Sequence, residues 1–267
     1  MLCEFPYRKG SLELGCGRCE GCRRNRNRLW TGRMLLESYE HEFNCFVTLT
    51  YNERHVPWNG YLVKEDLQGF LKRLRLACSG RTIRYYGVGE YGEKSSRPHY
   101  HMVLFGVSPL EEVTIRKSWP YGFVHVGTAE AKSMSYVSSY IMKGWTKDNV
   151  GRLGDRPPEF SIMSLKPGIG MGVVERIVQA FNHHPTADKL SVDKMRTDGY
   201  KYPLGAYIKS KLRERLGITD AERGEKLFAL VEELFQRKVQ EGSNYHQKRK
   251  ARILAGYGRI RRKEKVL

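Results

Sequence analysis

The sequence lacks any apolar stretch long enough to span a bilayer, and its mean hydropathy is −0.57. Its first ten residues, MLCEFPYRKG, also lack the apolar run and small-residue cleavage site that mark secretion. Cysteine is scarce, because six residues are spread unevenly over 267, too few for a disulfide scaffold. These absences predict a soluble protein with reduced thiols and no membrane partner, and they favour metal binding by the clustered cysteines.

Acidic residues are few relative to basic ones. There are 29 Asp and Glu against 47 Lys and Arg, so the formal net charge is +18 and the pI is about 9.7. A charge of this size indicates a polyanionic partner, and nucleic acid is the leading candidate. An acidic membrane surface would attract the same charge, but no segment of the sequence is suited to entering the bilayer.

Composition divides the chain into three regions. We expect residues 1–42 to form a Cys-rich, basic N-terminal arm and helix, and residues 43–147 to form the main folded domain. Residues 148–267 begin with a linker rich in Gly and Pro and continue as a basic, largely helical C-terminal region. Thr219 and Glu222 have the spacing of a capping box at the start of one C-terminal helix. The tail at 246–265 holds nine Lys and Arg against one Glu, a composition typical of a solvated segment that contacts DNA.

The middle region alternates between two hydrophobic periods. Period-2 alternation predicts strands at 46–51, 83–89, 99–105 and 123–126, and helical spacing predicts helices at 67–77 and 132–143. The predicted order is strand, helix, strand, strand, strand, helix. This order predicts an α+β fold with a central antiparallel sheet and helices on one face.

Two histidines on a predicted strand are candidate metal ligands. His99 and His101 flank one residue, so their side chains leave the same face of the strand, roughly 6.5–7 Å apart along it. Glu90 lies at the end of the preceding strand, where antiparallel pairing would bring its carboxylate to the same place. Two imidazoles and one carboxylate suit Mg²⁺ or Mn²⁺ acting on a phosphodiester. Ordinary hydrogen-bonded histidines are the alternative for an isolated His-x-His pair.

Two tyrosines on a predicted helix are candidate nucleophiles. Tyr136 and Tyr140 are four residues apart and share a helix face, and Lys143 follows three residues later on that face. Core packing is the alternative for such a stripe. A phenol with a pKa near 10 reacts poorly at neutral pH unless a cation or a metal-polarised phosphate lies close to it.

The N-terminal cysteines have the number of thiolates that a structural zinc site needs. Cys3, Cys16, Cys19 and Cys22 could hold one Zn²⁺ between them. Their spacing differs from that of a paired C-x₂-C knuckle, so three reduced cysteines in a tight turn remain the alternative.

Three motifs in order carry a family resemblance. FVTLTY (46–51), GEYGE…RPHYHMVLFG (89–106) and SYVSSYIMKG (135–144) resemble the motifs of the HUH endonucleases. CGRCEGCRRNR (16–26) and PEFSIMSLKPGIG (158–170) are similar to segments of the replication initiators of gokushovirus-type phages of the Microviridae. The resemblance covers about residues 1–170 and implies that residues 43–147 form an HUH nuclease palm.

Rolling-circle replication is the function that the resemblance implies. In such enzymes the two histidines bind a divalent metal with a nearby acidic residue, and a tyrosine attacks the phosphate to leave a 5′-phosphotyrosine and a free 3′-hydroxyl. A second tyrosine acts in the closing step, and Lys143 would help to neutralise charge at the phosphate.

The implied partners are a single-stranded DNA origin, a host polymerase and a host helicase in the host bacterial cytoplasm, because the sequence carries no helicase motif of its own. Two alternatives stay open. They are an HUH single-strand transposase or relaxase, and a non-catalytic nucleic-acid-binding protein.

Overall fold

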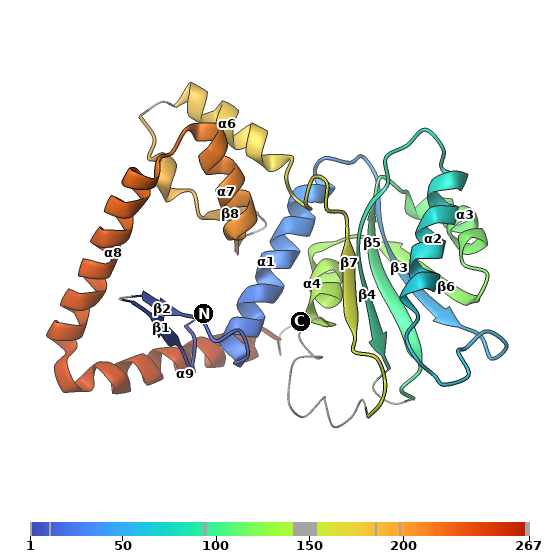
Figure 1. Ribbon diagram of the computed structural model, residues 1–267, viewed down its shortest axis with the longest axis horizontal. Helices are drawn as coiled ribbons and strands as arrows, with labels where there is room; N and C mark the ends of the chain where they lie inside the picture. Colours follow the sequence, from blue (N-terminus) through green and yellow to red (C-terminus); the bar gives the residue numbers. More distant parts are fainter. Residues whose placement is uncertain are drawn as a thin grey trace.

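The computed structural model describes residues 2–10, 12–92, 95–140, 154–184, 186–197 and 199–264. A five-stranded antiparallel sheet occupies one half of the molecule, with the strand order β6-β3-β5-β4-β7 (Figure 1). Its strands are β3 (Asn44–Tyr51), β4 (Arg84–Tyr91), β5 (Pro98–Phe105), β6 (Gly122–Thr128) and β7 (Phe160–Met163). Four of them coincide with strands that the alternating pattern predicts.

One face of the sheet is covered by helices α2 (Lys64–Ala77) and α3 (Glu112–Ser118). Every second residue of β3, from Cys45 to Tyr51, is buried on this face. The apolar residues of α2 recur at helical spacing and are all buried against these strand residues: Leu67, Phe70, Leu71 and Leu74. The match between the two periods fixes which side of each element faces the core.

The opposite face is covered by α1 (Glu20–Ser38) and α4 (Ala131–Tyr140) (Figure 1). The α+β fold class is confirmed, but helices lie on both faces of the sheet rather than on one. The physical reason is that β4 and β5 carry apolar residues at alternate positions on both faces. Those of the second face form a separate core with α1 and α4: Tyr86, Val88, Val103 and Phe105.

Strand β7 extends the sheet beyond residue 147, the boundary expected for the main domain. Its residues 160–163 pair with residues 86–89 of β4. The sequence analysis had assigned this segment to the linker, because Pro157 and Pro158 precede it. The described strands of the sheet therefore come from residues 44–163.

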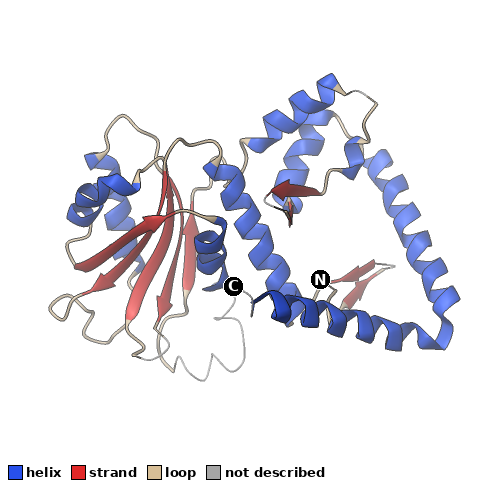
Figure 2. Cartoon of the chain, turned by 180° about the vertical axis from the view of Figure 1, so that it is seen from behind, coloured by secondary structure: helices blue, strands red, loops and turns tan. Residues whose placement is uncertain are grey.

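The C-terminal region and the N-terminal arm form the other half of the molecule (Figure 2). Helices α8 and α9 form two sides of an open frame whose third side is α1. Its elements are β1 (Tyr7–Lys9), β2 (Leu12–Leu14), α6 (Val173–His183), β8 (Lys194–Thr197), β9 (Tyr200–Pro203), α7 (Gly205–Leu216), α8 (Asp220–Glu241) and α9 (Tyr245–Glu264).

The C-terminal predictions are confirmed in part. The predicted capping box of Thr219 and Glu222 is present at the start of α8. The basic tail forms the helix α9 as far as Glu264, where the sequence analysis expected a solvated segment. Among the described residues, none of the helices has the length and apolar character needed to cross a bilayer.

A buried carboxylate fixes the end of α1 to the sheet. Glu37 accepts hydrogen bonds from Arg84 Nε on β4 and from the backbone N–H of Gly170, the latter at 2.6 Å. His41 Nε2 lies 3.5 Å from the same carboxylate. Burial acts to raise the pKa of Glu37, but the hydrogen bonds with His41, Arg84 and Gly170 outweigh it and hold the pKa below its usual value.

Candidate nuclease site

Antiparallel pairing of β4 and β5 brings the predicted metal ligands together. Glu90 is the register partner of His99, and His101 lies two residues further along β5. Glu90 Oε1 lies 2.7 Å from His99 Nε2 and 3.1 Å from His101 Nε2. The two imidazole centroids are 5.0 Å apart with their planes almost perpendicular, so both rings direct a nitrogen at one carboxylate.

The far nitrogen of each imidazole is held by a second contact. His99 Nδ1 lies 3.0 Å from the carbonyl oxygen of Arg97, and His101 Nδ1 lies 2.9 Å from Thr48 Oγ1. A carbonyl oxygen only accepts, so His99 Nδ1 carries a proton and its Nε2 keeps a lone pair for a ligand in the neutral ring. Contacts of this kind orient the imidazoles of metal sites.

The site is buried, and this burial shapes its charge. Glu90 and His101 are 4% and 5% exposed. Burial acts to raise the pKa of Glu90, but hydrogen bonds from His101 and His99 lower it below the usual value. Burial acts to lower the pKa of His99, but the Glu90 carboxylate raises it above the usual value. The three groups therefore stabilise a carboxylate beside imidazoles, which is the charge state that a cation needs.

These side chains fit a divalent cation. One donor atom each from Glu90, His99 and His101 lies within 4.8 Å of the others. Two imidazole nitrogens and one carboxylate oxygen are a donor set that divalent metals accept, with open positions left for water or phosphate.

Helix α4 directs both predicted nucleophiles at the same histidine. The ring of Tyr140 stacks on His101 at 5.1 Å between centroids, and the ring of Tyr136 meets it edge-on at 5.2 Å. The two phenol rings are 4.7 Å apart. Tyr136 is 46% exposed, whereas Tyr140 is 6% exposed, so the two phenols differ in their access to a substrate.

The phenol of Tyr140 is less acidic than a free tyrosine. Burial, a hydrogen bond with Tyr136 and the charge of Glu90 all raise its pKa. Its reactivity therefore depends on positive charge added to the site. Lys143, the cation predicted to supply part of that charge, lies outside the described residues.

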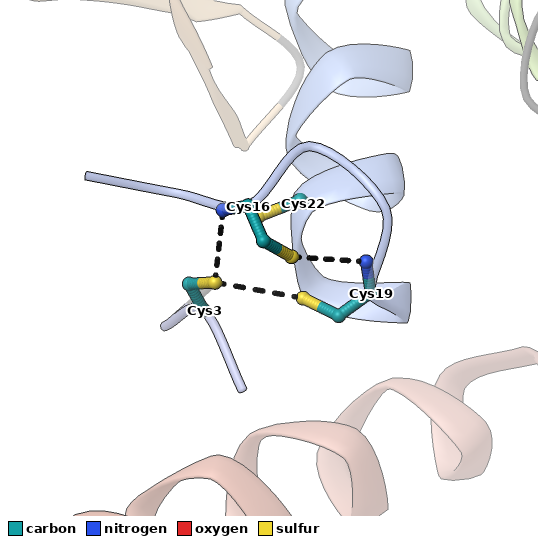
Figure 3. Close-up of side chains that lie close together, drawn as sticks. All are labelled: Cys3, Cys16, Cys19 and Cys22. Carbon is teal, nitrogen blue, oxygen red and sulfur yellow. Dashed lines mark hydrogen bonds between the residues drawn. The ribbon is translucent and has the colours of Figure 1, made fainter. Parts of the chain in front are cut away.

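The structure also brings the four N-terminal cysteines together (Figure 3). Cys19 is the N-cap residue of α1, Cys22 lies in the first turn of that helix, and Cys3 reaches them from the chain terminus. Cys3 Sγ lies 3.8 Å from Cys19 Sγ, and the backbone N–H groups of Cys16 and Cys19 donate to Cys3 Sγ and Cys16 Sγ at 3.2 and 3.3 Å.

The spacing of these sulfurs fits a tetrahedral ion. Four thiolates at the usual Zn–S distance would be about 3.8 Å apart, and all four sulfurs lie within 4.8 Å of one another. The backbone N–H of Cys19 is the main cause that lowers the pKa of Cys16 to about 6, while burial raises the pKa of Cys22 to about 12. The cluster thus has one thiol that ionises readily and another that needs a cation to do so.

Several residues of the site carried no signal in the sequence. Thr48 positions His101, and Phe46 stacks against the same imidazole at 5.9 Å between centroids. Asn27 of α1 binds α4 beside the tyrosines. Thr48 could have been found by pairing the predicted strands, since it is the register partner of His101. Nothing local marks Asn27.

Comparison with known proteins identifies the class as replication-associated proteins of DNA phages. Residues 44–145 match the model of the replication-associated protein ORF2 family, and over this segment the chain belongs to that family. The matched segment contains Glu90, both histidines and both tyrosines of the site. The resemblance found in the sequence motifs is thereby confirmed.

Three curated relatives are similar over longer stretches. The chain is 30% identical over 230 residues to the replication-associated protein ORF4 of Chlamydia phage 1, which covers 76% of this chain and 54% of the relative. It is 32% identical to the replication-associated protein ORF2 of Spiroplasma virus 4, over 48% of this chain and 47% of the relative. It is also 32% identical to the replication-associated protein VP4 of Bdellovibrio phage phiMH2K, over 50% and 49%. The chain spans about half the length of these relatives. No solved structure matches it.

Proposed function

We propose that this chain initiates rolling-circle replication by nicking and rejoining single-stranded DNA at a phage origin. The observation that carries the proposal is the position of His101. Its imidazole contacts the Glu90 carboxylate and also the rings of Tyr136 and Tyr140. A site with metal-binding donors next to two phenols suits transfer of a phosphodiester to tyrosine.

A divalent cation belongs to this proposal. Bound Mg²⁺ or Mn²⁺ would polarise the scissile phosphate and stabilise the charge that develops on its oxygens. Glu90, His99 and His101 would hold the cation, while Thr48 and the carbonyl of Arg97 keep both imidazoles oriented.

In the proposed nicking step, the phenol oxygen of Tyr136 or Tyr140 attacks phosphorus and gives up its proton. A bond forms between tyrosine and the 5′-phosphate, and the bond from phosphorus to the 3′-oxygen breaks. The 3′-oxygen takes up a proton and becomes the hydroxyl that primes synthesis. Lys143 would neutralise charge at the phosphate, a role that rests on its sequence spacing alone.

Two tyrosines would allow a complete replication cycle. After one round, the second phenol would cut the regenerated origin, and the 3′-hydroxyl so released would attack the first phosphotyrosine and close the circle. The 4.7 Å separation of the two rings supports this exchange, because both phenols reach the same histidine.

The proposed setting is the cytoplasm of a host bacterium. The partners are a single-stranded phage origin, a host helicase and a host polymerase. The relatives are named as replication-associated proteins, which favours replication over transposition or plasmid transfer. The net charge of +18 supports DNA as the partner.

A covalent protein–DNA band tests the proposed function. The full chain is incubated with phage single-stranded DNA and Mn²⁺, denatured and run on a gel. We expect an adduct that needs the metal and that the double change Tyr136→Phe with Tyr140→Phe eliminates. DNA binding without any adduct from the unmodified chain would instead favour a non-catalytic binding protein.

We further propose that Cys3, Cys16, Cys19 and Cys22 hold one structural Zn²⁺. The sulfur spacing supports it, as does the closed set of four thiolates, which leaves no position for a substrate. Elemental analysis of protein purified without chelator is expected to find about one zinc per chain. Protein free of zinc but fully folded would return the four residues to reduced cysteines in a turn.

A further inference from the structure

Helix α1 grips the tyrosine helix α4 through the side chain of one asparagine. Asn27 Nδ2 donates to the carbonyl oxygen of Ser135 at 2.7 Å and to Ser138 Oγ at 2.9 Å. In return, Ser135 Oγ donates to Asn27 Oδ1 at 2.9 Å. Thr31, one turn further along α1, places its hydroxyl 3.2 Å from Ser138 Oγ. We call these four residues the α1–α4 clamp.

The clamp is buried where its hydrogen bonds matter. Thr31 and Ser138 are 2% and 1% exposed. Away from water, a lost partner leaves a polar group unsatisfied, so each bond strongly favours one arrangement of the two helices. An amide is required at position 27, because the contact uses two donors and one acceptor. A carboxylate offers no donor, and an alkyl group offers neither.

The clamp grips α4 away from its tyrosines. Successive residues of a helix are about 100° apart around its axis, so Ser138 points away from both Tyr136 and Tyr140. The apolar contacts of α4, through Met134 and Val137, have no preferred direction. The directional bonds of Asn27 therefore fix the rotation of α4. A small rotation would carry both phenols away from His101.

We propose that Asn27 is a positioning residue of the nuclease site, which holds α4 so that its two tyrosines face the metal-binding histidines. This inference rests on the proposed function and adds α1, which lies outside the matched family segment at 44–145, to the machinery of the reaction. Asn27 touches neither DNA nor metal in this role.

The test compares rate with amount in the variant Asn27→Leu. Single-turnover adduct formation is followed with saturating single-stranded DNA and Mn²⁺. Misplaced tyrosines lower the rate constant, and we expect a loss of about 10- to 100-fold. The final amount of adduct and the affinity for DNA should stay within about 2-fold, since the basic surface is unchanged. A purely structural role would instead lower the amount of adduct and leave the rate constant alone.

Two further measurements keep the test decisive. Ser138→Ala removes a partner of Asn27 from the other helix, and its effect should not add to that of Asn27→Leu in the double variant. Hydrogen exchange of the α4 backbone should become faster in Asn27→Leu while that of β5 stays the same. This readout needs no activity and applies even if Asn27→Leu folds poorly, because Ser138→Ala can replace it.

Failure of the inference and failure of the proposed function look different. If the unmodified chain forms no adduct, the nuclease proposal fails, and unchanged α4 exchange in Asn27→Leu would overturn the clamp as well. If the unmodified chain forms adduct and Asn27→Leu forms it at the same rate, the site is a nuclease but Asn27 does not position it.

Discussion

The imidazole of His101 joins metal binding to the nucleophiles, and its removal is expected to stop the chemistry. The variant His101→Ala loses a ligand and the surface against which Tyr140 stacks. We expect adduct formation to fall by at least about 100-fold, with DNA affinity changed by less than about 3-fold. Gel assays and fluorescence anisotropy measure the two quantities.

The matched control for this variant is His183→Ala, which removes an exposed imidazole from α6. It should leave both the rate of adduct formation and DNA affinity unchanged. Equal loss of DNA affinity in the two variants would mean that histidines act through binding, which contradicts a role in chemistry.

The two tyrosines are expected to share the reaction. Each single variant, Tyr136→Phe or Tyr140→Phe, should keep some nicking but lose coupled rejoining, because a phenol still reaches His101. The double variant should form no adduct. Peptide mapping of the adduct checks this outcome. Adduct found only on Tyr140, together with normal circle closure by Tyr136→Phe, would show that Tyr136 only supports the helix.

At the scale of elements, α1 depends on Glu37 for its place on the sheet. In the variant Glu37→Leu, Arg84 loses its partner in a buried position, which should lower the free energy of unfolding by about 3 kcal/mol. Urea denaturation at neutral pH measures it. The control Glu112→Gln removes an exposed helical pair with Arg116 and should cost less than about 0.5 kcal/mol.

The same carboxylate gives this contribution a pH dependence. The pKa of Glu37 is lower in the folded chain than in the unfolded chain. Its contribution is therefore fully present above the unfolded pKa of about 4.3 and is lost as pH falls through the folded value. The difference in stability between the unmodified chain and Glu37→Leu should shrink in that acid range. A difference that stays constant with pH would contradict the assignment.

The elements that the sequence predicts are those with a clear local period. Alternation marks β3, helical spacing marks α2, and the His-x-His spacing already places two imidazoles on one side of β5. The second core escaped prediction, because apolar residues on both faces of a strand do not reveal what covers them. The short helix α3 and the four-residue strand β7 are too brief to show a period.

The site was predictable where pairing follows chain order and hidden where it does not. Glu90 could be placed beside His99, because consecutive antiparallel strands pair as neighbours. The bond from Asn27 to Ser135 joins residues 108 apart in sequence, and no local pattern records such a contact. The difference in exposure between Tyr136 and Tyr140 likewise depends on packing by distant segments.

At the scale of the whole molecule, the thiolate cluster connects the two ends of the chain. Arg249 of α9 donates to the backbone carbonyl of Cys3 at 2.5 Å, and the hydroxyl of Tyr257 accepts from the backbone N–H of Gly21 at 3.1 Å. Removal of zinc by a chelator should therefore release α9 as well as the N-terminal arm.

Hydrogen exchange measures this release. We expect faster exchange in residues 3–22 and in α9 after chelation, with β3 and β5 unchanged as the internal control. Restored protection on adding zinc back would show that the effect is reversible. If α9 exchanged at the same rate with and without zinc, the cluster would not be what holds it.

Strand β7 has a consequence for any shortened form of this protein. It pairs with β4 at the margin of the sheet, yet its residues come from beyond the family segment at 44–145. A fragment cut at those limits would leave the backbone N–H and C=O groups of β4 open and would uncover the second core, since α1 would be missing too. Open strand margins beside bare apolar surface are where chains stick to their own copies. The matched segment is therefore expected to aggregate when produced alone, and keeping it dispersed requires residues at both sides of it.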